Sequence, residues 1–325
     1  MKTSITGKRI LIAGGGFIGA HMSMKLKKMG NFVRIADIKR NPYVKEDYYS
    51  EAYFKDLRLI KNCISVTKDI DYVFNFAANM GGIGFITSAA ANIMFDNSMI
   101  NLNMLNASVK NNVQRFFFSS SACVYPEEKQ LKTRLVPLKE TDAIPAHPDT
   151  SYGWEKLYAE YLCKAFKEYF GLDIRIARYH NIYGSFGAYF GGREKAPAAL
   201  CYKISQVMNG DTINVWGDGK QTRSFCYIDD CIEGTIRLMN SNYTEPLNIG
   251  SDRRITIDKM VNIIENIAGK KLIKSHDMSR PQGVRGRNAD LTVTKKVLNW
   301  KPKISLENGL ALTYFWIDNQ TKQGF

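Results

Sequence analysis

The sequence of 325 residues predicts an α/β fold built on a doubly wound parallel sheet. Three observations lead to this prediction. Short apolar strands alternate with helical patterns as far as Arg178, and a glycine-rich turn joins the first strand to the first helix. The composition, with 45% hydrophobic and 23% charged residues, is ordinary for a globular enzyme.

The expected elements follow in order along the chain. A strand at Arg9–Ala13 precedes an amphipathic helix from about Phe17 to Met29, which ends at Gly30. Later strands are expected at Phe32–Ala36, Tyr72–Phe76, Arg115–Ser119 and Asp173–Arg178, and helices near Asn92–Asn111 and Tyr152–Tyr169, the second capped by Gly171. Beyond Arg178 the alternation is irregular, with returns to the sheet expected near Phe225–Met239 and Pro246–Ile249.

The glycine-rich turn fits the GxGxxG pattern of a Rossmann-type dinucleotide site. Its backbone N–H groups, at a helix N-terminus, suit a pyrophosphate. The predicted contacts are Gly14, Gly16, Phe17, Ile18 and Gly19.

Two acidic residues, Asp37 at the end of the second predicted strand and Asp56 further along, complete the predicted cofactor site. Asp37 can accept hydrogen bonds from both ribose hydroxyls and would repel a 2′-phosphate, so NAD is predicted in preference to NADP. Lys39 and Arg40 weaken this preference without reversing it. Asp56 is a candidate adenine contact, although an exposed loop acid would look the same.

Tyr152 and Lys156 form a YxxxK pair, which places both side chains on one face of a helix. We expect the ammonium, together with a positive nicotinamide ring, to lower the pKa of Tyr152 from about 10 so that the phenolate takes a hydroxyl proton. Ser121 is the candidate to hold that hydroxyl. The pair also occurs on ordinary helices, so the prediction depends on the neighbouring dinucleotide motif.

Six cysteines without CxxC spacing suggest neither a disulfide framework nor a zinc site. Cys123 is distinguished by its position two residues beyond Ser121, and a thiolate favoured by nearby cations can act as a base. The other five are expected to be buried packing residues. His147, His180 and His276 are too scattered to suggest a metal.

These motifs resemble the extended short-chain dehydrogenase/reductase superfamily and, within it, the GDP-mannose 3,5-epimerase family. Ala13 departs from the superfamily pattern at its first glycine, for which we expect a modest adjustment of the turn. The matching segments are Asn79–Phe85, Ser120–Pro126, His180–Gly184, Gly191–Ala199, Trp216–Phe225 and Gly283–Asn288.

The resemblance implies NAD-dependent epimerisation of GDP-mannose at C3 and C5, to GDP-L-galactose or GDP-L-gulose, through transient oxidation at C4. In the family, the residues corresponding to Cys123 and Lys195 are the base and the acid. The implied substrate contacts are Gly81, Ser121, Ala122, Cys123, Asn181, Glu194, Lys195, Ala196, Lys203, Gln221, Thr222, Arg223 and Arg287. Lys203, Arg223 and Arg287 suit a pyrophosphate, and the choice between Arg285 and Arg287 stays open.

We expect an NAD-binding domain at 1–180 with about 223–250, and a smaller α/β substrate-binding domain at 181–222 and 251–325. The resemblance implies a homodimer. The net charge of +14 is spread along the chain without a nucleic-acid motif, so we expect no nucleic-acid partner. No apolar run reaches a membrane span and the start lacks a signal-peptide core, so a cytoplasmic protein without membrane contact is expected.

Two alternatives remain open. The first is a 4-epimerase or a 4,6-dehydratase on a sugar nucleotide; a dehydratase would need a carboxylate pair where Ala122 and Cys123 stand. The second alternative, from a different class, is a non-catalytic NAD-binding scaffold, and only the net charge supports it.

Overall fold

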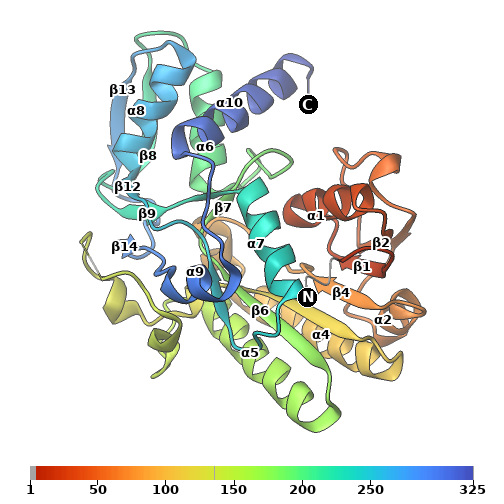
Figure 1. Cartoon of the computed structure of the whole chain (residues 1–325). Coiled ribbons are helices and arrows are strands. Elements are labelled where there is room, and N and C mark those ends of the chain that lie inside the picture. The colour runs from red at the N-terminus through yellow and green to blue at the C-terminus, as the bar shows by residue number, and fades with distance from the viewer. Residues whose placement is uncertain (1–4, 135, 325) are drawn as a thin grey trace.

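A seven-stranded parallel sheet occupies the centre of the computed structural model, which describes residues 5–134 and 136–324 (Figure 1). The strand order is β11-β6-β5-β4-β1-β2-β3, and every neighbouring pair is parallel. The strands are β1 Arg9–Ala13, β2 Phe32–Asp37, β3 Glu51–Phe54, β4 Tyr72–Asn75, β5 Arg115–Ser121, β6 Asp173–Tyr179 and β11 Leu247–Ile249. This arrangement confirms the predicted doubly wound sheet, whose strand order reverses between β1 and β4.

Helices cover both faces of the sheet: α1 packs beside α7 on one face, and α4 packs between α2 and α5 on the other (Figure 1). The helices are α1 Phe17–Lys28, α2 Ile60–Thr67, α3 Ile83–Ser88, α4 Ala90–Lys110, α5 Ser151–Phe170, α6 Ala196–Ser205, α7 Ile228–Asn240, α8 Ile257–Ala268, α9 Thr292–Leu298 and α10 Leu306–Lys322. Among the described residues, none of these helices has the length and apolar character needed to cross a lipid bilayer.

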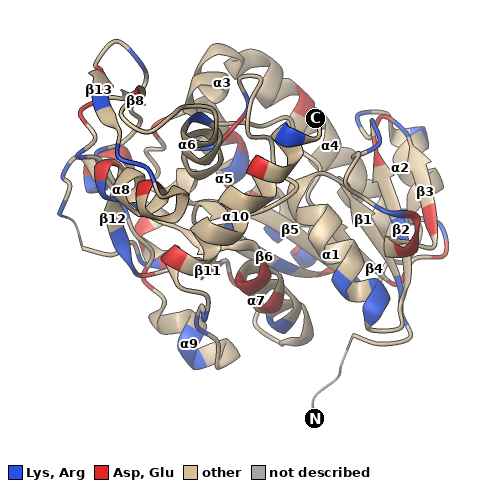
Figure 2. Ribbon diagram, turned by 90° about the horizontal axis from the view of Figure 1, so that it is seen from above, with Lys and Arg blue, Asp and Glu red and all other residues tan. Residues whose placement is uncertain are grey.

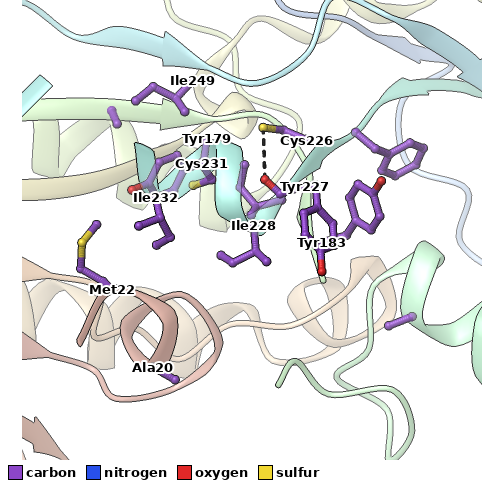
Figure 3. Packing of buried hydrophobic residues seen from close by; sticks show 14 of the residues in the cluster. Ala20, Met22, Tyr179, Tyr183, Cys226, Tyr227, Ile228, Cys231, Ile232 and Ile249 are labelled. Atoms are coloured by element: carbon purple, nitrogen blue, oxygen red, sulfur yellow. Dashed lines mark hydrogen bonds between the residues drawn. The ribbon is translucent and has the colours of Figure 1, made fainter. Parts of the chain in front are cut away.

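The core on the α1–α7 face is a continuous apolar cluster (Figure 3). Ala20 and Met22 of α1 face Ile228 and Ile232 of α7, all with at most 4% exposure. Burying such side chains contributes about 25 cal/mol per Å² of apolar surface. The packing fixes α1, and with it the glycine-rich turn, against the sheet.

Three small sheets lie outside the central one. Their strands are β7 Ile182–Tyr183 with β10 Cys226–Tyr227, β8 Thr212–Trp216 with β13 Ile273–Asp277, and β9 Thr222–Ser224 between β12 Arg254–Thr256 and β14 Gly286–Arg287. The last sheet pairs β9 and β14 in a register that sets Arg223 opposite Arg287. Lys and Arg are interspersed with Asp and Glu around the whole ribbon (Figure 2).

Most of the predicted elements are confirmed, and two corrections have physical reasons. The strand β3 and the helix α2 were not predicted. For β3 the reason is that it is an edge strand whose side chains are half-buried or exposed, so it lacks an apolar run. Phe225–Met239 does not return as a strand of the central sheet: β10 pairs with β7, and α7 packs on the sheet face instead. Gly171 does cap α5, with a φ of 70°.

A buried ion pair ties α5 to the sheet. Arg178 of β6 donates to both carboxylate oxygens of Glu160 at 2.9 and 2.7 Å, and the two side chains are each 5% exposed. Ser120 of β5 donates to the same carboxylate at 2.5 Å. Because neither charge can be solvated by water, each depends on the other.

Replacing Glu160 with Gln leaves the Arg178 guanidinium buried without its counter-charge. We expect the free energy of unfolding to fall by about 3–5 kcal/mol, measured by urea denaturation. The matched control is Glu168→Gln on the same helix, which breaks the exposed Lys164–Glu168 pair of 3.9 Å and should change it by less than about 0.5 kcal/mol. Equal losses in the two variants would contradict this account.

Candidate active site

The glycine-rich turn connects β1 to α1 by a backbone path that leaves no space for a side chain at Gly14 or Gly19. A Cβ at Gly14, where φ is 90°, would lie 2.5 Å from the backbone nitrogen of Ala77, and one at Gly19 would lie 1.9 Å from the Gly14 oxygen. Gly16 is exposed and is the N-cap of α1, so the first N–H groups of the helix are available to an anion. Ala13 is a regular residue of β1, fully buried and paired with Ala36, so the strand accommodates its methyl group.

The two predicted acidic contacts differ in their surroundings. Asp37 is half-buried at the end of β2, where one carboxylate oxygen accepts from the Lys39 backbone N–H at 3.2 Å. Asp56 is ion-paired with Arg58 at 2.7 Å, and this hydrogen bond lowers the pKa of Asp56. Arg58 also binds Asp96 at 2.8 Å, so Asp56 is held in a surface ion-pair cluster.

The end of β5 meets the start of α5 at the centre of the site. Ser121 caps the turn Ala122–Val124 by accepting from the Cys123 N–H at 3.2 Å. Gly153 lies in the first turn of α5, and a Cβ there would be 2.1 Å from the Cys123 carbonyl oxygen. The absence of a side chain at Gly153 therefore allows α5 to approach the Cys123 turn, and Tyr152 joins an apolar cluster that Cys123 also contacts.

Tyr152 and Lys156 lie together as the YxxxK spacing predicts. Both are buried, with 7% and 2% exposure, and the Lys156 Nζ lies 5.7 Å from the centroid of the Tyr152 ring. Burial raises the pKa of Tyr152 well above its ordinary value, the charges of Cys123 and Glu155 add to the rise, and a hydrogen bond with Ser121 opposes it. In the chain without cofactor, desolvation of the phenolate is the largest effect on this pKa. The lowering expected from Lys156 together with a positive nicotinamide ring stays a prediction.

Glu155 is the centre of a polar network that was not predicted from the sequence. Its carboxylate accepts from Asn97 at 3.1 Å and from Asn101 at 2.8 Å, both on α4. Asn97 in turn accepts from the backbone N–H of Asn79 at 2.6 Å. Burial raises the pKa of Glu155, although Lys156 and the two amides lower it. The network ties the first turns of α5 to the segment that begins at Asn79.

Lys195 is brought in by a loop that packs on this segment. A Cβ at Gly82 would lie 2.2 Å from the Glu194 carbonyl oxygen, and Arg193 donates to Asn79 at 3.0 Å. Lys195 is half-buried as the N-cap of α6. Burial lowers the pKa of Lys195, whereas Cys123 raises it. The predicted acid and the predicted base thus interact electrostatically.

Arg287 contacts the predicted base directly. Its Nη1 donates to the Cys123 Sγ at 3.1 Å and its Nε to Gln130 at 2.5 Å. The second terminal nitrogen lies 3.5 Å from a carboxylate oxygen of Asp149. Burial opposes the charge of Arg287, but Cys123 and Asp149 raise its pKa. Gln130 and Asp149 were not predicted, because nothing in the sequence near either residue indicates that a guanidinium reaches it.

The other predicted cations have different partners from Arg287. Burial and the charge of Arg287 lower the pKa of Arg223 to about 9, although Asp149 and Cys123 oppose the shift. Lys203 donates to the backbone oxygen of Asn214 at 2.9 Å. Arg285 forms a two-pronged ion pair with Asp218, at 3.0 Å for each contact.

Three of the remaining predicted substrate contacts, Asn181, Gln221 and Thr222, lie in or beside β9 or bond to it. Gln221 and Thr222 are buried in or beside β9, and the Gln221 side-chain oxygen has no hydrogen-bond partner among the described residues. Asn181, with a φ of 45°, donates to the Ser224 carbonyl at 2.9 Å. Gly81 is buried beside Phe85. A side-chain cluster able to hold a metal ion does not occur within the described residues.

Fold and site together define an enzyme that combines dinucleotide-dependent hydride transfer with proton transfer. Residues 10–250 match the NAD dependent epimerase/dehydratase family, and the chain belongs to that family. NAD is its cofactor, and the close-approach glycines at the head of α1 fit that role.

Two of the curated relatives that the chain resembles are GDP-mannose 3,5-epimerases of plants. The chain is 48% identical to GDP-mannose 3,5-epimerase of Arabidopsis thaliana, over 99% of this chain and 84% of the relative. It is 49% identical to GDP-mannose 3,5-epimerase 1 of Oryza sativa subsp. indica, over 97% and 83% of the two chains.

Solved structures of sugar-nucleotide epimerases share the fold. UDP-glucose 4-epimerase of Thermotoga maritima, solved with UDP-glucose, matches with a TM-score of 0.85 and 27% identity, over 96% of this chain and 99% of that one. UDP-glucuronic acid 4-epimerase of Bacillus cereus, solved with UDP-glucuronic acid and NAD, matches with a TM-score of 0.83 and 26% identity, over 98% and 100%.

Gly153→Ala should separate α5 from the Cys123 turn by roughly 1 Å, because the new methyl group would overlap the Cys123 carbonyl oxygen. A displacement of this size costs about a hundredfold in turnover. Steady-state turnover and circular dichroism would measure activity and folding. The control is Gly84→Ala, whose methyl group would lie 3.5 Å from Trp216 and should be tolerated; near-normal turnover of Gly153→Ala would refute the constraint.

Proposed function

We propose that this chain epimerises GDP-mannose at C3 and C5, by oxidation at C4, proton exchange at the two neighbouring carbons and re-reduction. The similarity to proteins named GDP-mannose 3,5-epimerase over nearly the whole chain supports the substrate. The observation that carries the chemistry is the position of the Cys123 thiol, which contacts Arg287 and interacts with both Tyr152 and Lys195.

The Tyr152–Lys156 pair suits the oxidation step. When bound, NAD supplies the hydride acceptor and donor and, in its oxidised form, a positively charged ring. Tyr152 takes the proton of the C4 hydroxyl, and Ser121, which is hydrogen-bonded to Tyr152, holds that hydroxyl. Because burial favours the neutral phenol, ionisation of Tyr152 depends on positive charge from Lys156 and from the oxidised cofactor.

Cys123 and Lys195 suit the proton exchange. The C4 ketone makes hydrogens at C3 and C5 acidic. The Cys123 thiolate takes such a proton: an S–H bond forms, the C–H bond breaks, and its electron pair moves to the C4 oxygen as an enolate. Lys195 then returns a proton to carbon from the other side, and burial, by lowering its pKa, makes the ammonium a stronger acid.

Lys203 and Arg223 are the proposed pyrophosphate contacts. We assign Arg287, which contacts the Cys123 thiol, to the reacting end of the substrate. Arg285 is assigned no substrate contact, because it is ion-paired with Asp218. The remaining substrate contacts and the assignment of Asp56 to adenine stay proposals from the resemblance.

We also propose the division into an NAD-binding part, residues 1–180 with about 223–250, and a substrate-binding part. Its support is that the central sheet is built from the first part, whereas β8, β12, β13 and β14 lie in the second. A cytoplasmic location and the absence of nucleic-acid and membrane partners stay predictions, which cell fractionation would test.

A homodimer through α4 and α5 is the proposed assembly. Trp154, Tyr158 and Tyr161 follow helical spacing along α5 and are 43%, 49% and 56% exposed, and Phe95 of the adjacent α4 is 64% exposed. Exposed apolar side chains gathered on two adjoining helices are typical of an interface between subunits.

GDP-mannose incubated with the enzyme and NAD in heavy water should gain deuterium at C3 and C5, detected by NMR. We expect Cys123→Ser to slow this exchange at least about a hundredfold while still allowing C4 oxidation. Tyr152→Phe should lose both C4 oxidation and deuterium exchange, because without the C4 ketone the hydrogens at C3 and C5 are not acidic. Epimerisation without deuterium at either carbon would instead indicate a 4-epimerase.

The double change Tyr158→Glu with Tyr161→Glu places two charges on the proposed interface and should convert the dimer to a monomer in light scattering after gel filtration. Leu312→Glu is the control, since Leu312 is 53% exposed on α10, away from α4 and α5. A wild-type monomer, or a dimer that survives the double change, would refute the proposed interface.

A further inference from the structure

Charged and titratable groups from four elements surround the Cys123 thiol. Arg287 of β14 donates to the sulfur, and Arg223 of β9, Lys195 at the head of α6 and Tyr152 of α5 interact with it electrostatically. Three of these four groups are cationic side chains. A thiolate stabilised too strongly by cations is a poor base, because its basicity falls with its pKa.

One carboxylate faces these cations. Asp149 precedes α5, is 10% exposed, and lies 3.5 Å from the Arg287 terminal nitrogen. Apart from this ion pair, the same Asp149 oxygen has no hydrogen-bond partner among the described residues. Asp149 also interacts with Arg223, and it lines a cavity of about 400 Å³ together with Ile83 and Gly283.

The guanidinium of Arg287 therefore contacts two groups, the Cys123 thiol and the Asp149 carboxylate. Gln130 fixes its Nε, so the two terminal nitrogens point separately, one at Cys123 and one at Asp149. Arg287 is 7% exposed, and water does not compete for its charge. The negative charge of Asp149 offsets part of the positive charge that Arg287 presents to the thiolate.

We propose that Asp149 is a positioning residue for the reaction, which holds Arg287 and balances its charge so that Cys123 remains a base strong enough to remove a proton from carbon. This inference rests on the proposed function. Asp149 acts through Arg287 and does not itself contact the reacting atoms.

The test is the pH dependence of iodoacetamide alkylation at Cys123, read by peptide mass spectrometry on the NAD-bound enzyme. The other five cysteines are buried and Cys123 is half-buried, so its peptide can be followed separately. Arg287→Gln should raise the midpoint by about one pH unit, because the thiolate loses its nearest cation. Asp149→Asn should lower it by about half a unit, because the full charge of Arg287 then acts on the sulfur.

The matched control is Glu127→Gln, which removes a carboxylate from the wall of the same cavity and should leave the midpoint within about 0.2 unit. A purely structural role of Asp149 would release Arg287 and raise the midpoint, as Arg287→Gln does. A shift in that direction, or one no larger than that of Glu127→Gln, overturns the proposal.

The double variant keeps the test decisive if Asp149→Asn does not fold, because Arg287 is then no longer left buried without its partner carboxylate. With Arg287 already replaced, Asp149→Asn should cause no further shift; a further fall of about half a unit would show that Asp149 does not act through Arg287. Deuterium exchange into GDP-mannose is measured alongside. If the wild-type enzyme shows none, the proposed function fails, whereas the alkylation midpoints still decide the role of Asp149.

Discussion

The close contact between the first turn of α5 and the turn after β5 is the constraint on which the site depends. Gly153 allows the helix backbone to lie against the Cys123 carbonyl, and the same approach places Tyr152 beside Ser121. The Glu160–Arg178 ion pair fixes the helix to β6 one turn beyond Lys156. The Tyr152–Lys156 pair on the helix and the Cys123 thiol in the turn after β5 thus share one rigid junction.

The sheet explains why this junction meets the cofactor site. Strand order reverses between β1 and β4, and the glycine-rich turn and the end of β5 both lie at the carboxyl ends of parallel strands. The small β9–β14 sheet then brings Arg223 and Arg287 over from far along the chain. The glycine-rich turn and the end of β5 are therefore close in space although they are far apart in the sequence, because both strands end at the same edge of the sheet.

The sequence alone predicted the parts of the molecule that local pattern determines. The buried run of β1, the capped helix α5 and the YxxxK spacing are local features, and the structure has them where expected. Contacts such as Gln130 and Asp149 with Arg287 join residues more than a hundred positions apart, and no local pattern encodes them. The burial that raises the pKa of Tyr152 could not be predicted from the sequence, because it depends on tertiary packing around the phenol.

The contact of Gly82 with the Glu194 carbonyl has a consequence for how substrate enters. Since these backbones touch and Arg193 also binds Asn79, the loop that carries Lys195 and the segment at 79–85 are clamped together. If substrate enters by a shift of either segment, the other segment moves with it, because the two backbones are in contact. The ammonium group of Lys195 would then keep its position relative to residues 79–85 throughout the movement.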